Sequence, residues 1–338
     1  MLGRLFFISF LFTLILSSCG TARLGAPQEI SIKYDTKKDV HYGKTIPFSV
    51  YVKYEKGATK DVTKKSETTY VIEGGRISGE QIIVEDRPLS FEVDKVVVKA
   101  TYTLKDEKLE KTITIPFNYK GDLIIDFSGE DGMDGEDGKN RGSALLSRDG
   151  KDGDDGGDGE NGGDGNTISA YIYKDTINHF YKIKVSNIDD GKNYYYKTKD
   201  FSHKIKFLAD AGHGGDGGDG GNAGDGKDAK VKEDKTKDAG DGGDGGNGGN
   251  GGNAGNAGSV FVFIHPSAYS LKEIISGSSN PGIPGVAGTA GEAGVAGTVL
   301  EGQEYKQDGV PGVPGFAGVH GSVGSGVMIS VEDFDIDF

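Results

Sequence analysis

The chain has few of the residues that mark disulfide-rich, nucleic-acid-binding or membrane-spanning proteins. Among its 338 residues there is one Cys, there is no Trp, and only nine are Pro. A single Cys excludes a disulfide framework within one chain. Basic residues are outnumbered 38 to 52, and the net charge of −14 argues against a nucleic-acid partner, whose phosphates are bound by Lys and Arg. No apolar run reaches the roughly 20 residues that span a bilayer.

Glycine is the residue in excess, and the excess is local. The chain contains 58 Gly, of which only 8 lie in residues 1–118. An average protein has roughly 7 % Gly, so the second part of the chain is compositionally biased and the first part is not. The two parts therefore call for different structures.

The N-terminus has the layout of an export signal. A basic start, Met1 to Arg4, leads into an apolar run, Leu5 to Leu16, and then into Ser17-Ser18-Cys19-Gly20. This resembles the lipobox of bacterial lipoproteins, which implies that residues 1–18 are removed, that Cys19 is acylated and binds membrane lipid, and that 19–28 is a tether. Gly20 in place of Asp implies an outer-membrane or cell-surface location. The alternative is an ordinary secretory signal with an incidental Cys.

Residues 29–120 alternate apolar and polar side chains, for example at Ile30–Ile32, Phe48–Val52, Val96–Val98 and Ile113–Ile115. Period-2 runs separated by polar turns predict an antiparallel β-sandwich. The stretch 52–63, with a Gly turn before Asp-Val-Thr, resembles a hairpin of bacterial immunoglobulin-like domains. That resemblance implies a spacer, with ligand binding as the alternative.

Six runs in the second part carry Gly at every third position. We number them run 1 to run 6: Gly129–Gly138, Gly150–Gly165, Gly212–Gly226, Gly240–Gly258, Gly282–Gly297 and Gly309–Gly324. A three-residue period predicts extended left-handed helices of the polyproline-II type with Gly along one edge. A bare glycine edge lets another backbone approach closely.

Two arrangements use such an edge. In a collagen triple helix three chains share it, and Gly309-Val-Pro311 and Gly312-Val-Pro314 look collagen-like. The runs are short and interrupted, however, and runs 3 and 4 have Gly on two of three edges, which suits packing within one chain. We therefore expect a monomer with an intramolecular bundle, and a trimeric collagen-like protein remains the alternative.

Short connections join the runs in three pairs, and strand-like stretches lie between the pairs. This order resembles the glycine-rich N-terminal domain of the Obg family of GTPases, which implies six polyglycine-II-type helices on a small β-barrel over residues 121–338. The predicted fold is thus mainly β, with an Ig-like sandwich before that domain. No phosphate loop follows, since Gly43-Lys44-Thr45 has Lys38 in place of the first Gly, so no nucleotide is expected.

Runs 1 and 2 carry rows of aspartates, which are candidate calcium ligands: Asp131, Asp134, Asp137, Asp152, Asp155 and Asp158. Calcium takes 6–8 oxygen ligands. Neighbours on one edge are roughly 9 Å apart, so two facing rows would be required. The alternative is a solvated edge that keeps the bundle soluble, with no cofactor.

Runs 5 and 6 carry apolar residues on the corresponding edge: Ile283, Val286, Val295, Val310, Val313, Phe316 and Val319. We expect this row to be buried against another element. The alternative is an exposed strip that binds a protein or glycan partner, with Val286, Val310, Val313 and Phe316 as the candidate contacts.

The Tyr-rich segment 167–210 offers aromatic rings that could stack on sugars, although any exposed strand has a similar pattern. The six His residues are scattered, and no catalytic motif is present. The sequence therefore predicts a non-enzymatic lipoprotein of the bacterial envelope with a structural or adhesive role.

Overall fold

A computed structural model describes residues 24–143, 148–199, 203–232 and 235–335, so Cys19 lies outside the described residues. Strands make up 35 % and helices 3 % of the structure, which confirms the mainly β prediction. The described residues form two compact units: unit 1 comprises 24–124, 175–182, 194–199 and 203–204, and unit 2 comprises the other described residues. Within the described ranges, no helix is both long and apolar enough to cross a bilayer.

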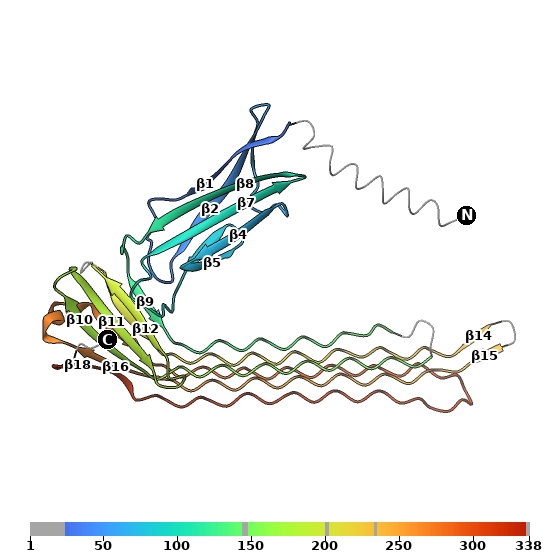
Figure 1. The fold of residues 1–338 in the computed structure, drawn as a ribbon. Helices are drawn as coiled ribbons and strands as arrows, with labels where there is room; N and C mark the ends of the chain where they lie inside the picture. Colours follow the sequence, from blue (N-terminus) through green and yellow to red (C-terminus); the bar gives the residue numbers. More distant parts are fainter. Residues whose placement is uncertain (1–23, 144–147, 200–202, 233–234, 336–338) are drawn as a thin grey trace. The chain divides into compact units, whose positions relative to one another are not determined.

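Unit 1 is built around two antiparallel sheets (Figure 1). The first has the order β1-β2-β6-β5 with β3 also paired to β2, and the second has the order β4-β7-β8. Their bounds are β1 Pro27–Tyr34, β2 Thr45–Tyr54, β3 Thr59–Asp61, β4 Thr68–Glu73, β5 Gly75–Ser78, β6 Gln81–Val84, β7 Lys95–Leu104 and β8 Glu107–Pro116.

Alternation along β2 and β7 creates the core of unit 1. Every second residue is buried from Ile46 to Tyr54 in β2 and from Val96 to Tyr102 in β7, and the intervening ones are partly or fully exposed. The hydroxyl groups of Tyr54 and Tyr102, one from each sheet, are hydrogen-bonded at 2.8 Å. The predicted hairpin after β2 is present, because Gly57 takes a positive φ of 83° and β3 returns along β2. Period-2 patterning therefore predicted this unit correctly at the level of antiparallel sheets.

Two further sheets hold the strands that precede and follow the glycine runs; most of their residues belong to unit 2, whereas nearly all of β12 and the start of β11 are counted in unit 1. One has the order β17-β13-β9, and the other the order β12-β11-β10-β16-β18. Their bounds are β9 Leu123–Asp126, β10 Ile168–Asp175, β11 Phe180–Asn187, β12 Asn193–Thr198, β13 Ile205–Leu208, β16 Ser259–Ile264, β17 Ile275–Ser278 and β18 Gly326–Val331, with a 3-10 helix, η1, at Pro266–Ile274.

The two sheets have different relations to the glycine runs. Strands β9, β13 and β17 each lead into an outgoing run, whereas β10, β16 and β18 each follow a returning run. Strands that receive neighbouring parallel runs pair in parallel, as β10 does with β16 and β16 with β18. The described strands form no closed barrel, so the expected small barrel is wrong. The outgoing runs start from the sheet of β9, β13 and β17, and the returning runs end at the sheet that contains β10, β16 and β18. These are two separate hydrogen-bonded sheets.

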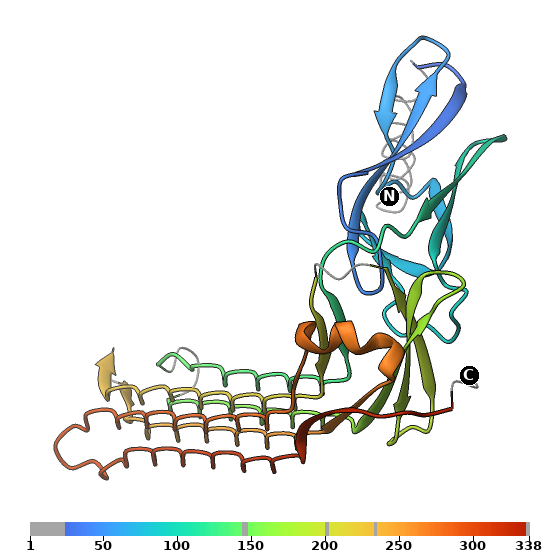
Figure 2. The same ribbon diagram turned by 90° about the vertical axis from the view of Figure 1, so that its left-hand side faces the viewer.

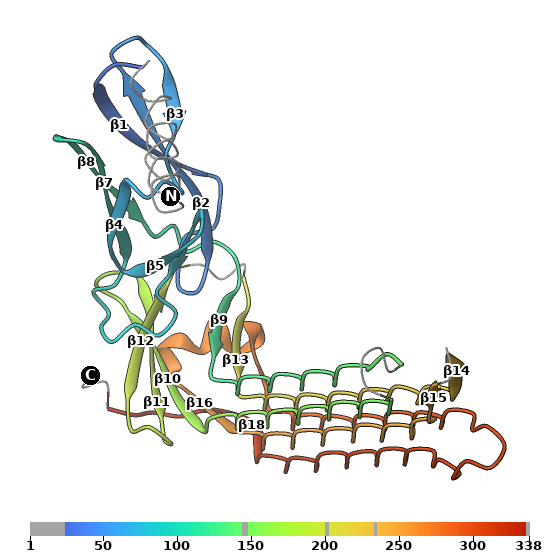
Figure 3. The same cartoon turned by 90° about the vertical axis from the view of Figure 1, so that its right-hand side faces the viewer.

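The six runs lie side by side as extended segments (Figures 1, 2 and 3). The connection between runs 3 and 4 carries a small hairpin of β14 (Lys230–Lys232) and β15 (Lys235–Lys237). Backbone N–H groups of glycines in one run donate to carbonyls in another, for example Gly218 to Gly157 at 2.9 Å. A Cβ at Gly218 would lie 2.1 Å from the Glu136 carbonyl oxygen, so no larger residue fits there.

Candidate functional site

The most regular feature of the described chain is a two-point contact between runs, which we call the Asx–Gly bridge, where Asx is Asp or Asn. In one example the Gly245 N–H donates to the Val310 carbonyl at 2.9 Å. The side chain of the preceding residue, Asp244, accepts the Val310 N–H at 2.7 Å. One Asx–Gly pair in one run thus binds both backbone groups of a single residue in another run, here run 4 and run 6.

The bridge repeats along four junctions between runs. When the residues that directly flank the runs are included, the described residues make four such side-chain contacts from run 1 to run 3, and six each from run 2 to run 4, run 3 to run 5, and run 4 to run 6. Partners are separated by a constant 82, 92, 70 or 66 residues at the respective junctions. The register therefore does not slip along any junction. His213 is the one acceptor among these that is not Asx, and its Nδ1 accepts the Ile283 N–H.

Alanine replaces the bridging Gly at a few positions, including Ala223 and Ala254. Where the bound residue is Thr, the bridge has one more hydrogen bond, from the Thr hydroxyl. The Thr289 backbone N–H and hydroxyl both donate to Asp219, and they lower the pKa of that carboxyl. The charged form of this aspartate is therefore the bridging form.

All six aspartates predicted as calcium ligands take part in these bridges. The Oδ1 atoms of Asp131, Asp134 and Asp137 accept N–H groups of run 3, and those of Asp152, Asp155 and Asp158 accept N–H groups of run 4. Among the described residues, no three His, Cys, Asp or Glu side chains gather closely enough to hold a metal ion. The rows lie beside backbone amides rather than facing each other, and calcium binding there stays a prediction.

The apolar row of runs 5 and 6 is exposed. Exposed fractions are 61 % for Val286, 65 % for Val310, 63 % for Val313 and 79 % for Phe316. The expectation of burial is therefore wrong for these residues. Asx–Gly pairs of run 4 bind the backbone of run 6, and glycine N–H groups of run 6 donate to carbonyls of run 5. The apolar side chains of run 6 therefore lie on its remaining edges, in solvent. The alternative, an exposed strip, is the arrangement found.

The Tyr-rich segment supplies core residues rather than a platform of rings. Tyr173, Tyr194 and Tyr196 are buried. Tyr171 is stacked on Phe263 with ring centroids 5.0 Å apart, and Tyr195 meets Phe91 edge-on at the same distance. Rings engaged in this way are poorly placed to stack on a sugar.

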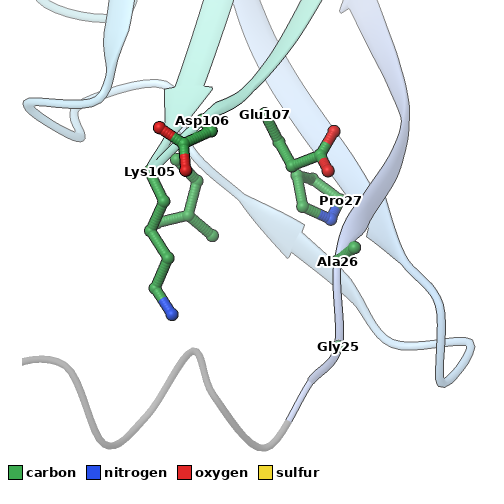
Figure 4. A pocket seen from close by; sticks show the side chains of 7 residues that line it. Gly25, Ala26, Pro27, Lys105, Asp106 and Glu107 are labelled. Atoms are coloured by element: carbon green, nitrogen blue, oxygen red, sulfur yellow. The ribbon is translucent and has the colours of Figure 1, made fainter.

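A shallow pocket of about 350 Å³ lies in unit 1 (Figure 4). The start of β1 and the β7–β8 turn line it, with Pro27, Lys105, Asp106 and Glu107 among the side chains. These charged groups are on a solvent-facing turn, and binding pockets instead place a few polar groups within apolar walls.

In comparisons of the chain with protein-family models, with curated proteins and with solved structures, no match was found. Functional argument therefore rests on the runs and their edges.

Sequence reasoning missed the bridges, although a signal was present. Asx–Gly pairs recur at three-residue spacing in runs 1 to 4, and this pattern by itself predicts bare glycine edges with solvated side chains. Residues of this kind are exposed, as expected, but each also accepts a hydrogen bond from the next run.

Substitution of a bridging side chain tests its contribution. Asn250 accepts the Phe316 N–H at 2.9 Å, and Asn250→Ala leaves that amide to water. We expect a loss of about 0.5–1.5 kcal/mol in the free energy of unfolding, measured by urea titration. Asn250→Asp keeps the acceptor and serves as the matched control. Equal stabilities for the Ala and Asp variants would show that the bridge does not stabilise the array.

Proposed function

We propose that this protein is a non-enzymatic lipoprotein of the bacterial envelope that displays a rigid bundle of six polyglycine-II-type helices. One observation carries the proposal: the glycine edges of the runs are packed against backbone of the same chain. Ideal Cβ atoms at Gly153, Gly218 and Gly246 would lie 1.8–2.1 Å from carbonyl oxygens of neighbouring runs. A frame held by backbone hydrogen bonds at this density suits a structural role.

The same observation favours the monomer over the collagen-like trimer. A triple helix needs each glycine edge for two other chains. In runs 2, 3 and 4 these edges are already occupied, for example at Gly249, where a Cβ would meet the Gly157 carbonyl oxygen at 1.9 Å. Three hairpins of runs between strands support the resemblance to the Obg glycine-rich domain, while the absence of a closed barrel among the described strands departs from it.

Unit 1 fits the role of an Ig-like spacer in this proposal. Its support is the pair of antiparallel sheets with alternating burial. Its hairpin at Gly57 follows the pattern that suggested the family. The chain has one Cys in all, so the sheets are held by packing and hydrogen bonds instead of a bridge between them.

A second candidate function is adhesion through the strip of Val286, Val310, Val313 and Phe316, which its exposure favours. Exposed apolar rows on a soluble protein often mark contact surfaces. An unknown protein or glycan would be the ligand.

Anchoring is tested by the change Cys19→Ala in the full chain. Acylation places fatty chains in the membrane, and each buried CH₂ adds about 0.8 kcal/mol to the free energy of membrane binding. We expect the wild type to incorporate a labelled fatty acid and to sediment with membranes, and the variant to do neither. Equal labelling of the two would contradict acylation at Cys19, and release of the wild type as a soluble protein would contradict the envelope anchor.

A further inference from the structure

The four junctions share one direction. In each, the earlier run supplies the Asx–Gly pair, and the later run supplies the backbone N–H and C=O that the pair binds. The runs therefore form two rows, 1-3-5 and 2-4-6. Among the described residues, no Asx–Gly pair binds run 1 or run 2, the first run of each row, and run 5 and run 6, the last ones, bind no further run in this way. The two edges of the array are thus chemically different.

The last runs have lost the Asx acceptor at every position of the bridge and the backbone N–H donor at three positions. Residues at the Asx position are Ile283, Val286, Thr289, Glu292 and Val295 in run 5 with Thr298 just after it, and Val310, Val313, Phe316, Val319 and Ser322 in run 6 with Gln307 just before it. None of them is Asx. At the next position, Pro284, Pro311 and Pro314 have no N–H to donate. Runs 1 to 4 contain no proline, so the change coincides with the end of each row.

The first runs have the opposite character. Asp131, Asp134 and Asp137 of run 1 hold the place that His213, Asp216 and Asp219 hold in run 3, where backbone groups are bound by run 1. All three are exposed, and the described chain offers no hydrogen-bond partner to their backbone N–H or C=O. Asp152, Asp155 and Asp158 of run 2 have the same properties. These backbone groups form an open edge.

We propose that the edge of runs 1 and 2 is a docking surface for an extended chain with Asx–Gly at every third residue, and that runs 5 and 6 are capped so that a second copy does not dock there. This docking surface continues an interface that occurs four times within the chain, and the proposal rests on the intramolecular bundle proposed above. The open edge of runs 1 and 2 resembles an exposed β-strand edge, which pairs with another chain unless it is blocked. A self-complementary array would add copies head to tail without closing.

The experiment removes the caps. The uncapped variant carries Ile283→Asn, Pro284→Gly, Val286→Asn, Val310→Asn, Pro311→Gly, Val313→Asn, Pro314→Gly and Phe316→Asn. The matched control carries Thr at the same five apolar positions and keeps all three prolines. Both are compared with the wild type by light scattering over a range of concentrations, and far-UV circular dichroism of the wild type tests the bundle independently.

We expect the uncapped variant to show a mass that rises with concentration to multiples of the monomer, while the wild type and the control stay monomeric. An uncapped variant that has the wild-type spectrum and stays monomeric would overturn the proposal. A wild type that self-associates and a control that does not would also overturn it, since the strip would then be the interface.

A peptide experiment covers the case in which the uncapped variant does not fold. A peptide with the sequence of run 4 (Gly240–Gly258) is added to the wild type, and one with the sequence of run 6 (Gly309–Gly324) is the control. We expect the run 4 peptide to shift the NMR signals of the Asp152, Asp155 and Asp158 amides, and the run 6 peptide to leave them unchanged. No shift, or equal shifts with both peptides, would contradict the docking surface.

Discussion

Gly246→Ala is expected to lower the free energy of unfolding of unit 2 by at least about 4 kcal/mol, or to prevent the array from forming. A Cβ at this buried position would lie 2.0 Å from the Asp154 carbonyl oxygen and 2.6 Å from its carbon. Both are backbone atoms of run 2, so no side-chain rotation relieves the clash. To accommodate it, runs 2 and 4 would have to separate, and the bridges along their whole junction would break.

A graded series of alanine substitutions checks the cause. At Gly157 the nearest atom to the added Cβ is the Glu136 nitrogen at 3.1 Å, and at exposed Gly142 there is nothing within 4 Å. We expect a loss of about 1–2 kcal/mol for Gly157→Ala and less than about 0.5 kcal/mol for Gly142→Ala in urea unfolding. Similar losses at all three positions would mean that helix propensity, and not close approach, sets the requirement for glycine.

Acidification from pH 7 to pH 4 is expected to destabilise unit 1 by about 3 kcal/mol through His41. Only 3 % of this side chain is exposed, and within the described chain its Nε2 has no hydrogen-bond partner. Burial lowers the pKa of His41 to about 4, with the Lys44 charge acting in the same direction. The unfolded chain takes up the proton near pH 6.5, so stability is constant above that value and falls as pH drops toward 4.

The measurement is urea unfolding of the wild type and of His41→Gln across this range. The variant has no imidazole at this position, so the difference in stability between the two proteins should change by about 3 kcal/mol between pH 7 and pH 4. His320→Gln, at an exposed position in run 6, is the control and should follow the wild type. A difference that does not vary with pH would show that His41 is protonated in the folded state.

Local patterns predicted the elements that depend on neighbouring residues. The strand-like pattern that follows run 4 is β16, and the apolar stretch Val327–Val331 after run 6 lies within β18. The glycine period placed all six runs and their pairing into hairpins. Strands β4 and β5 escaped prediction because half of their residues are exposed and the apolar alternation is weak. Helix η1 and strand β17 also escaped prediction, because their sequence patterns are equally short.

Properties that depend on the neighbour of each run could not be obtained from the sequence. Asp155 and Asn247 are 92 residues apart, and only the parallel placement of runs 2 and 4 brings them together. Whether Phe316 is buried or exposed likewise depends on whether another run packs against run 6, and no local pattern predicts that. The barrel expectation failed for the same reason, since the partners of β9, β13 and β17 follow from the order of the runs.

The central claim is that the six runs pack within one chain. Light scattering and far-UV circular dichroism on the soluble chain beginning at Gly20 test it most directly. The account predicts a monomer with the signal of extended left-handed helices, lost on heating at a temperature that does not depend on protein concentration. A trimer whose signal disappears at a concentration-dependent temperature, as its chains separate, would contradict it.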